Sequence, residues 1–280
     1  MQGSQFCTTD AGELRQGEIG MALFKTSNPA LSDKTFGSLN GSGYGGGYGR
    51  IIDATSRMTL NGTVNKTGIL LLCAIATACW TWRLFLVSRD FADVAPLMIG
   101  GLIGGFICAI VTVFKKEWSP VTAPIYALLE GLALGGISAA LELRYAGIAI
   151  QAVSLTFGTL LVLLLAYRSG LIPVTQKLRI GIVAATGGIA VFYMLEMMLG
   201  FFGIRFAAIN GGGMIGIGFS LFVVAIAALN LVLDFDFIER GVQAGAPKYM
   251  EWYGAFGIMV TLVWLYLEIL RLLSKMRSRN

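Results

Sequence analysis

Histidine is absent from this 280-residue chain, and charged residues make up only 13% of it. The chain therefore lacks the side chain that most often ligates metal ions and that titrates near neutral pH. Any response to pH must come from carboxylates. The four cysteines have neither metal-ligand nor disulfide-framework spacing, so they indicate no resident metal and no disulfide scaffold.

Long basic runs are also missing, although the formal net charge is +5. Basic residues stand beside apolar segments in ones and twos, without the interleaved aromatic residues of a nucleic-acid surface. This pattern predicts orientation in a membrane and no nucleic-acid partner. The first 20 residues include Asp10, Glu13 and Glu18 and no apolar run, so a cleaved secretory signal is not expected.

Hydrophobic residues are abundant, at 56% of the chain, with a mean hydropathy of +0.74. A membrane helix needs about 20 apolar residues, so seven helices would use about half of the chain. We therefore predict an all-α polytopic membrane protein in the lipid bilayer. The expected helices span approximately residues 67–87, 93–114, 121–141, 146–167, 178–202, 214–233 and 252–273.

Residues 1–65 differ in composition from residues 66–275, which contain the predicted membrane domain. The first region is polar and rich in glycine and serine, above all at 41–49, and is predicted to be a mostly disordered tail. The glycines do not form a phosphate-binding loop, because no Gly-Lys-Ser/Thr sequence follows them. Glycines within 93–114, at Gly100, Gly101, Gly104 and Gly105, predict a close helix contact or a pore lining.

Charged loop residues predict that the N-terminus is cytoplasmic. Ten basic residues then lie inside: Arg50, Arg57, Lys66, Lys115, Lys116, Arg168, Lys177, Arg179, Arg240 and Lys248. Four lie outside: Arg83, Arg89, Arg144 and Arg205. The basic C-terminal residues 271–279 do not fit seven crossings, so either they are an exception or the last segment re-enters the membrane.

The acidic residues fall at three depths of the predicted bundle. Asp234, Asp236, Glu239 and Glu251 lie at the inner mouth, Glu130 near mid-membrane, and Glu142, Glu196 and Glu268 toward the outer side. A charge at the bilayer centre costs about 2.5–3.5 kcal/mol, so Glu130 should face the bundle interior, as a functional or a structural group. Glu142 and Glu268 are expected to pair with Arg144 and Arg271. Carboxylates this dispersed, without a nucleophile motif, predict that the chain is not an enzyme and has no small-molecule substrate.

Asp234 and Asp236 follow the long apolar segment that ends at Leu233. Two residues on a helix differ by about 200° in direction, so the two carboxylates cannot face one neighbour unless the helix ends there. One interpretation is a solvated helix terminus. The other has Asp234 pointing into the bundle, with Asn230 one turn earlier on the same face.

Four stretches resemble the Bax inhibitor motif family, in its prokaryotic branch: residues 65–70, 119–135, 233–234 and 270–273. The resemblance implies a seven-helix bundle with a central last helix. It also implies a pH-sensitive calcium leak controlled by paired aspartates on the sixth and seventh helices. Asp234 matches the first aspartate, with Asp236 as the alternative if the register shifts by two residues. The seventh-helix positions that should be acidic are Gly257 and Thr261, which argues against direct proton sharing.

Our hypothesis is a passive cation leak, with calcium as the suspected permeant ion and no other cofactor or metal. Asp234 and Asp236 would bind ions and sense pH, since hard cations prefer carboxylate oxygens. The cations that could latch these acids are Lys115, Lys116 and Arg240, and the possible pathway residues are Glu130, Asn230 and Glu251. The alternative is a non-transporting factor that binds another membrane protein, such as a quality-control protease. The expected location is the bacterial inner membrane.

Overall fold

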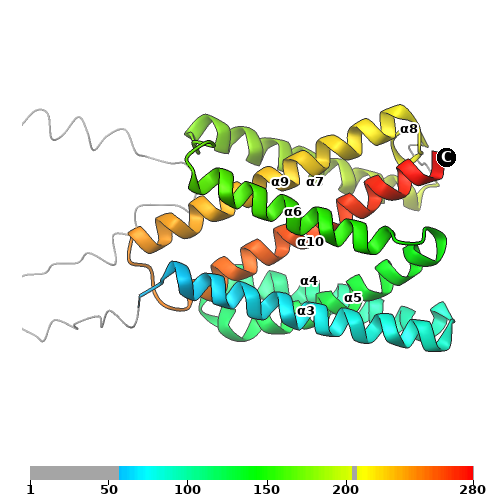
Figure 1. The fold of residues 1–280 in the computed structure, drawn as a ribbon, viewed down its shortest axis with the longest axis horizontal. Helices are drawn as coiled ribbons and strands as arrows, with labels where there is room; N and C mark the ends of the chain where they lie inside the picture. The colour runs from blue at the N-terminus through cyan, green and yellow to red at the C-terminus, as the bar shows by residue number, and fades with distance from the viewer. Residues whose placement is uncertain (1–56, 204–206, 280) are drawn as a thin grey trace, which may run out of the picture. The chain divides into compact units, whose positions relative to one another are not determined.

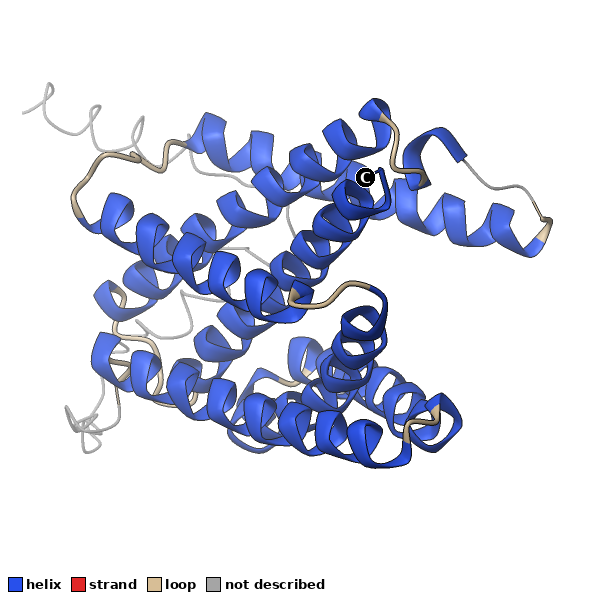
Figure 2. Cartoon of the chain, turned by 45° about the vertical axis from the view of Figure 1, so that its right-hand side comes forward, coloured by secondary structure: helices blue, strands red, loops and turns tan. Residues whose placement is uncertain are grey.

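Helices make up nearly all of the described chain (Figure 2). The structure, a computed structural model, describes residues 57–203 and 207–279. Within those ranges, seven helices are long and apolar enough to cross a membrane. They are α3 Leu60–Ser88, α4 Phe91–Phe114, α5 Ser119–Arg144 with the preceding turn η2 Lys116–Trp118, α6 Ile148–Arg168, α7 Gln176–Phe201, α9 Met214–Gln243 and α10 Met250–Arg279; α8, Ala207–Asn210, is a short turn before α9. The predicted all-α polytopic architecture is confirmed.

The first helix begins earlier than expected, at Leu60. Thr59 is its N-cap residue, because its hydroxyl oxygen accepts a hydrogen bond from the Gly62 amide at 3.0 Å and so satisfies a free helix-end donor. Residues 60–65, which we had placed in the tail, are therefore helical. The predicted disorder of the tail falls on residues 1–56, which lie outside the described residues.

The sixth and seventh membrane helices also run further than their apolar stretches. α9 ends at Gln243, whereas we had predicted an end at Leu233. Asp234 and Asp236 therefore lie inside a continuous helix, and the solvated-terminus interpretation is wrong. α10 is unbroken from Met250 to Arg279, and Figure 1 shows it running the length of the bundle to the C-terminus. Re-entry of the last segment does not occur.

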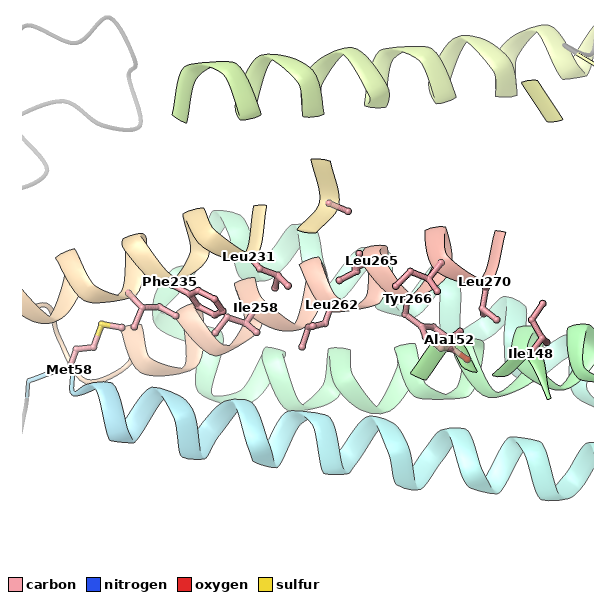
Figure 3. Packing of buried hydrophobic residues seen from close by; sticks show 13 residues of the cluster. Met58, Ile148, Ala152, Leu231, Phe235, Ile258, Leu262, Leu265, Tyr266 and Leu270 are labelled. Atoms are coloured by element: carbon pink, nitrogen blue, oxygen red, sulfur yellow. The ribbon is translucent and has the colours of Figure 1, made fainter. Parts of the chain in front are cut away.

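α10 is the central helix of the bundle. It packs on α3, α5, α6 and α9 and contributes the largest set of buried residues. In the main apolar cluster, Leu231 and Phe235 of α9 face Ile258 and Leu262 of α10 (Figure 3). This arrangement confirms the expectation of a central last helix.

Glycines bring α3, α4 and α5 into close backbone contact. A Cβ atom at Gly135 of α5 would lie 2.5 Å from the Ala78 carbonyl oxygen of α3, and one at Gly101 of α4 would lie 2.5 Å from the Leu129 carbonyl oxygen of α5. Both positions must be glycine for the helices to approach this far. Nothing lies within 4 Å of a Cβ at Gly100, so only part of the predicted glycine surface forms the contact.

Contacts between the helix ends show that successive membrane helices run in opposite directions. Thr59 before α3 contacts Glu251 at the start of α10, and Arg179 near the start of α7 contacts Asp236 near the end of α9. We call this end the N-terminal end of the bundle. Near the end of α10, Arg277 donates a hydrogen bond to the Ala146 carbonyl oxygen just before α6, which marks the C-terminal end.

Candidate functional site

Asp234 projects from α9 toward the central helix α10. Its Oδ1 atom lies 3.8 Å from the Cβ position of Gly257, and its carboxyl group interacts with the Thr261 hydroxyl one turn further along α10. Its Oδ2 atom is buried and has no hydrogen-bond partner within the described residues. The two positions where the family resemblance expects an acid are thus the two that face Asp234, and neither offers a second carboxylate or a cation.

Asn230 and Glu130 do not join Asp234 in one polar lining. Asn230 donates a hydrogen bond to the Thr186 hydroxyl of α7 at 2.8 Å and another to the Ile226 carbonyl oxygen at 2.8 Å, so it ties α9 to α7 and does not point at α10. Glu130 is 8% exposed and faces α4, where its Oε2 atom lies 2.9 Å from the Cβ position of Gly105. Its predicted interior position is confirmed, but its neighbour is the α4 backbone and not α9.

Asp236 is held by two cations at the N-terminal end of the bundle. Its Oδ2 atom lies 2.6 Å from Arg179 of α7 and 2.8 Å from Arg240, one turn later on α9. The arginine side chains are 37% and 49% exposed, and the aspartate side chain is 15% exposed. Charges that water can reach are only weakly bound to each other, so this cluster can open at low cost.

The three cations that we predicted as a latch differ in their contacts. Arg240 does contact a predicted site carboxylate, but that carboxylate is Asp236 and not Asp234. Lys115 and Lys116 lie instead over the aromatic rings of Trp118 and Tyr253, where each ammonium meets the negative face of the ring. Neither lysine forms an ion pair within the described residues.

Glu251 clasps the start of α10 to the start of α3. Its side chain is fully buried and pairs with Lys66 and Lys248, and its Oε1 atom accepts hydrogen bonds from the Thr59 amide and hydroxyl, both at 2.8 Å. A Cβ atom at Gly62 would overlap this carboxylate. We had placed Glu251 among the pathway residues, but its oxygens are already occupied by protein donors. Its position indicates a structural contact that joins α10 to α3.

The loop before α10 lies outside the membrane spans and contains Tyr249, whose pKa is shifted from its ordinary value. Burial, and then the nearby Glu117 carboxylate, raise the pKa of Tyr249, because both disfavour a phenolate. The Tyr249 carbonyl oxygen accepts a hydrogen bond from the Ser119 hydroxyl at 3.0 Å. Tyr249 is therefore neutral at physiological pH, and its backbone ties this loop to α5.

At the C-terminal end, acids and bases are bound more deeply. Glu268 is 3% exposed; it accepts a hydrogen bond from the Tyr193 hydroxyl at 3.0 Å and pairs with Arg271 at 3.3 Å, as predicted. Lys275 is 6% exposed and donates to the Ile209 carbonyl oxygen at 2.7 Å and the Ser220 hydroxyl at 2.8 Å. These contacts account for two of the basic C-terminal residues that the loop-charge rule did not fit, because Arg271 pairs with Glu268 and Lys275 is buried inside the bundle.

Two further acids at this end bind backbone or amide donors. Glu142 accepts hydrogen bonds from the Gly147 and Ala149 amides and so caps the start of α6. The predicted pair with Arg144 is wrong, since that guanidinium lies over the Tyr145 ring. Glu196, for which the sequence offered no partner, accepts from the Asn210 side-chain amide.

Sequence reasoning missed Arg179 as the partner of Asp236 and Lys66 as the partner of Glu251. Both had been counted only as loop charges that set orientation. The available signal was their position, because Arg179 begins one helix at the same predicted level at which Asp236 ends another. Pairing them required knowing that α7 lies beside α9, and α3 beside α10.

A protein-family model described as Bax inhibitor 1 like matches residues 13–278 of the chain. The match covers α3 to α9 completely and α10 up to residue 278. No curated protein and no solved structure matches the chain.

Proposed function

Because the chain belongs to the Bax inhibitor 1-like family, we propose that this multi-pass membrane protein is a pH-sensitive passive leak for calcium. Asp234 and Asp236 control it at the N-terminal end of the bundle, which faces the cytoplasm of a bacterial cell. The observation that carries the proposal is the buried Oδ2 atom of Asp234, which has no hydrogen-bond partner within the described residues. A carboxylate oxygen without a protein donor inside a membrane bundle is costly, and such groups mark ion pathways.

The two aspartates have separate roles. Asp234 has no cation paired with it among the described residues, and its Oδ2 atom has no hydrogen-bond partner there, so this oxygen can attract a hard cation such as calcium. Asp236 is occupied by Arg179 and Arg240 and acts as the latch that holds α7 against α9. The ion therefore meets Asp234 only after the latch opens.

Protonation of the two aspartates has opposite effects on the leak. A neutral Asp236 no longer binds the two arginines, so acid opens the latch. A neutral Asp234 no longer attracts the cation, so acid also lowers occupancy. Because Gly257 and Thr261 supply no second carboxylate to Asp234, the leak responds to separate protonation steps and not to a shared proton. The proposal involves no catalytic step and no resident cofactor.

The test is calcium flux into proteoliposomes that contain the purified protein, measured at several pH values. Asp234→Asn keeps the shape of the side chain but removes its charge, and we expect it to reduce flux by about tenfold, corresponding to about 1.4 kcal/mol of lost ion attraction. Asp93→Asn is the matched control, because Asp93 is an exposed acid in the first turn of α4. Its flux should equal that of the unmodified protein.

Unchanged flux and unchanged pH response in Asp234→Asn would refute the ion-binding role. A protein that conducts nothing under any condition, yet co-purifies with one membrane protein through residues 1–56, would instead support a non-transporting factor that binds a membrane partner.

A further inference from the structure

An apolar cavity of about 550 Å³ lies between α3 and α6, with α5 and α10 behind it. Its walls include Ala74 and Ala78 of α3 and Ala149 and Val153 of α6, and Met259 and Val263 of α10 form its floor. None of the described residues that line it is charged. α3 and α6 each pack on α10 and α5 but are not among the closely packed helix pairs, which leaves this space between them.

The hydroxyl groups in the lining are already hydrogen-bonded. The Ser138 hydroxyl lies 2.7 Å from the Tyr266 hydroxyl, and Ser138 also donates to the Leu134 carbonyl oxygen at 2.6 Å. Thr156 donates to the Ala152 carbonyl oxygen at 2.8 Å. The remaining lining groups are too few to supply the two to four polar partners that an ordered water needs, so the occupant must be apolar.

The cavity opens sideways, toward the hydrocarbon of the membrane. Its rim includes Ile75 of α3 and Ile150 and Val153 of α6, which are 47%, 67% and 38% exposed. These residues belong to the exposed apolar surface of two membrane-spanning helices. Bilayer lipids cover that surface. The volume is within the range of about 300–1,000 Å³ that is typical of ligand pockets.

We propose that this cavity binds one acyl chain of a bilayer phospholipid, which enters between α3 and α6 and contacts the central helix α10. A phospholipid suits the site better than a free fatty acid, because the described lining offers no cation for a free carboxylate. The headgroup of a phospholipid can stay at the membrane surface while its chain fills the cavity. This inference does not depend on the proposed calcium leak.

The test uses the purified full chain in nanodiscs of phosphatidylcholine doped with a phosphatidylcholine that carries a diazirine midway along one acyl chain. After irradiation, labelled residues are mapped by peptide mass spectrometry. We expect labels on Met259, Leu262 and Val263, which are 1%, 4% and 7% exposed. Lipids that only surround the bundle cannot reach these side chains. Labels confined to exposed residues of the outer helix faces would overturn the proposal.

Val153→Trp narrows the entrance and should reduce labelling of α10 severalfold. Val183→Trp, at a lipid-exposed valine of α7 that does not line the cavity, should leave it unchanged. Labelling of exposed residues provides the internal reference for folding in both variants. Undiminished α10 labelling in Val153→Trp contradicts the assigned route. If α10 is labelled by a diazirine fatty acid but not by the phospholipid, the assignment of a phospholipid is wrong.

Discussion

α3, α4 and α5 pack together tightly, whereas α7 packs closely on α9 alone among the described helices. Half of the most apolar stretch of α5 is buried in the protein, but only 11% of the corresponding stretch of α7. Glycine-mediated backbone contacts join the first group. α7 is attached through one small apolar cluster, in which Ile189 packs on Val223 and Ile226 of α9, and through polar side chains such as Arg179, which pairs with Asp236.

This difference indicates which part of the bundle can move. In a membrane, van der Waals packing is the main force between helices, and individual polar contacts contribute little. The α3–α5 group, fastened to α10 by Glu251, should therefore behave as a rigid unit. α7 should be the more mobile helix, and it carries the arginine that latches Asp236.

The clasp between α3 and α10 should give the largest effect. Glu251→Gln leaves Lys66 and Lys248 without their carboxylate, and we expect it to cost about 3 kcal/mol of unfolding free energy, because breaking a buried ion pair strands its partners. The measurement is reversible denaturation in mixed detergent micelles. Glu117→Gln, at an exposed acid near the same end, should change stability little. Equal stability of the two variants would show that the clasp is not structural.

The second-largest effect on stability should come from the glycine contact between α5 and α3. A Cβ atom at Gly131 would overlap the Ala74 carbonyl oxygen of α3, so Gly131→Ala should cost about 2 kcal/mol through forced separation of the helices. Gly187→Ala on α7 meets nothing within 4 Å and should be neutral or stabilising by up to about 1 kcal/mol. Thermal unfolding of the two variants side by side tests the contrast between the tight and loose regions. A destabilised Gly187→Ala would mean that α7 is packed as tightly as α5.

The polar attachment of α7 should contribute less. Thr186→Val removes the acceptor of the Asn230 amide, and the expected cost is about 0.6 kcal/mol, the average for hydrogen bonds between membrane helices. Faster hydrogen exchange of α7 amides should accompany it. Thr159→Val on α6 is the control, because no hydrogen bond of the Thr159 side chain is found within the described residues. Unchanged exchange in Thr186→Val would argue that other contacts hold α7.

The latch should affect stability least and flux most clearly. Arg179→Gln removes one of the two cations on Asp236, and calcium flux at neutral pH should rise about twofold to threefold, corresponding to less than 1 kcal/mol. Acid should then increase flux less than it does in the unmodified protein, since the latch is already weakened. Arg168→Gln replaces an exposed arginine at the same end and should leave the flux–pH profile as it was. A profile for Arg179→Gln identical to that of the unmodified protein would exclude Asp236 as the latch.

Sequence patterns located all seven membrane helices, since each needs a long apolar stretch that composition alone reveals. They located the helix ends less well. α3 extends past its apolar stretch to the Thr59 cap, and α9 continues ten residues beyond Leu233, from 233 to 243. Charged residues can remain helical there because they pair with neighbouring helices, and hydropathy does not detect such pairing.

The sequence by itself determined that the chain is an all-α membrane protein, and its family resemblance identified Asp234 with the non-acidic partner positions Gly257 and Thr261. Only the tertiary structure decided which cation meets which acid. Ion pairs such as Arg179–Asp236 and Lys66–Glu251 join residues 57 and 185 positions apart. Helical periodicity relates residues three or four apart, so contacts between distant helices depend on how the bundle packs.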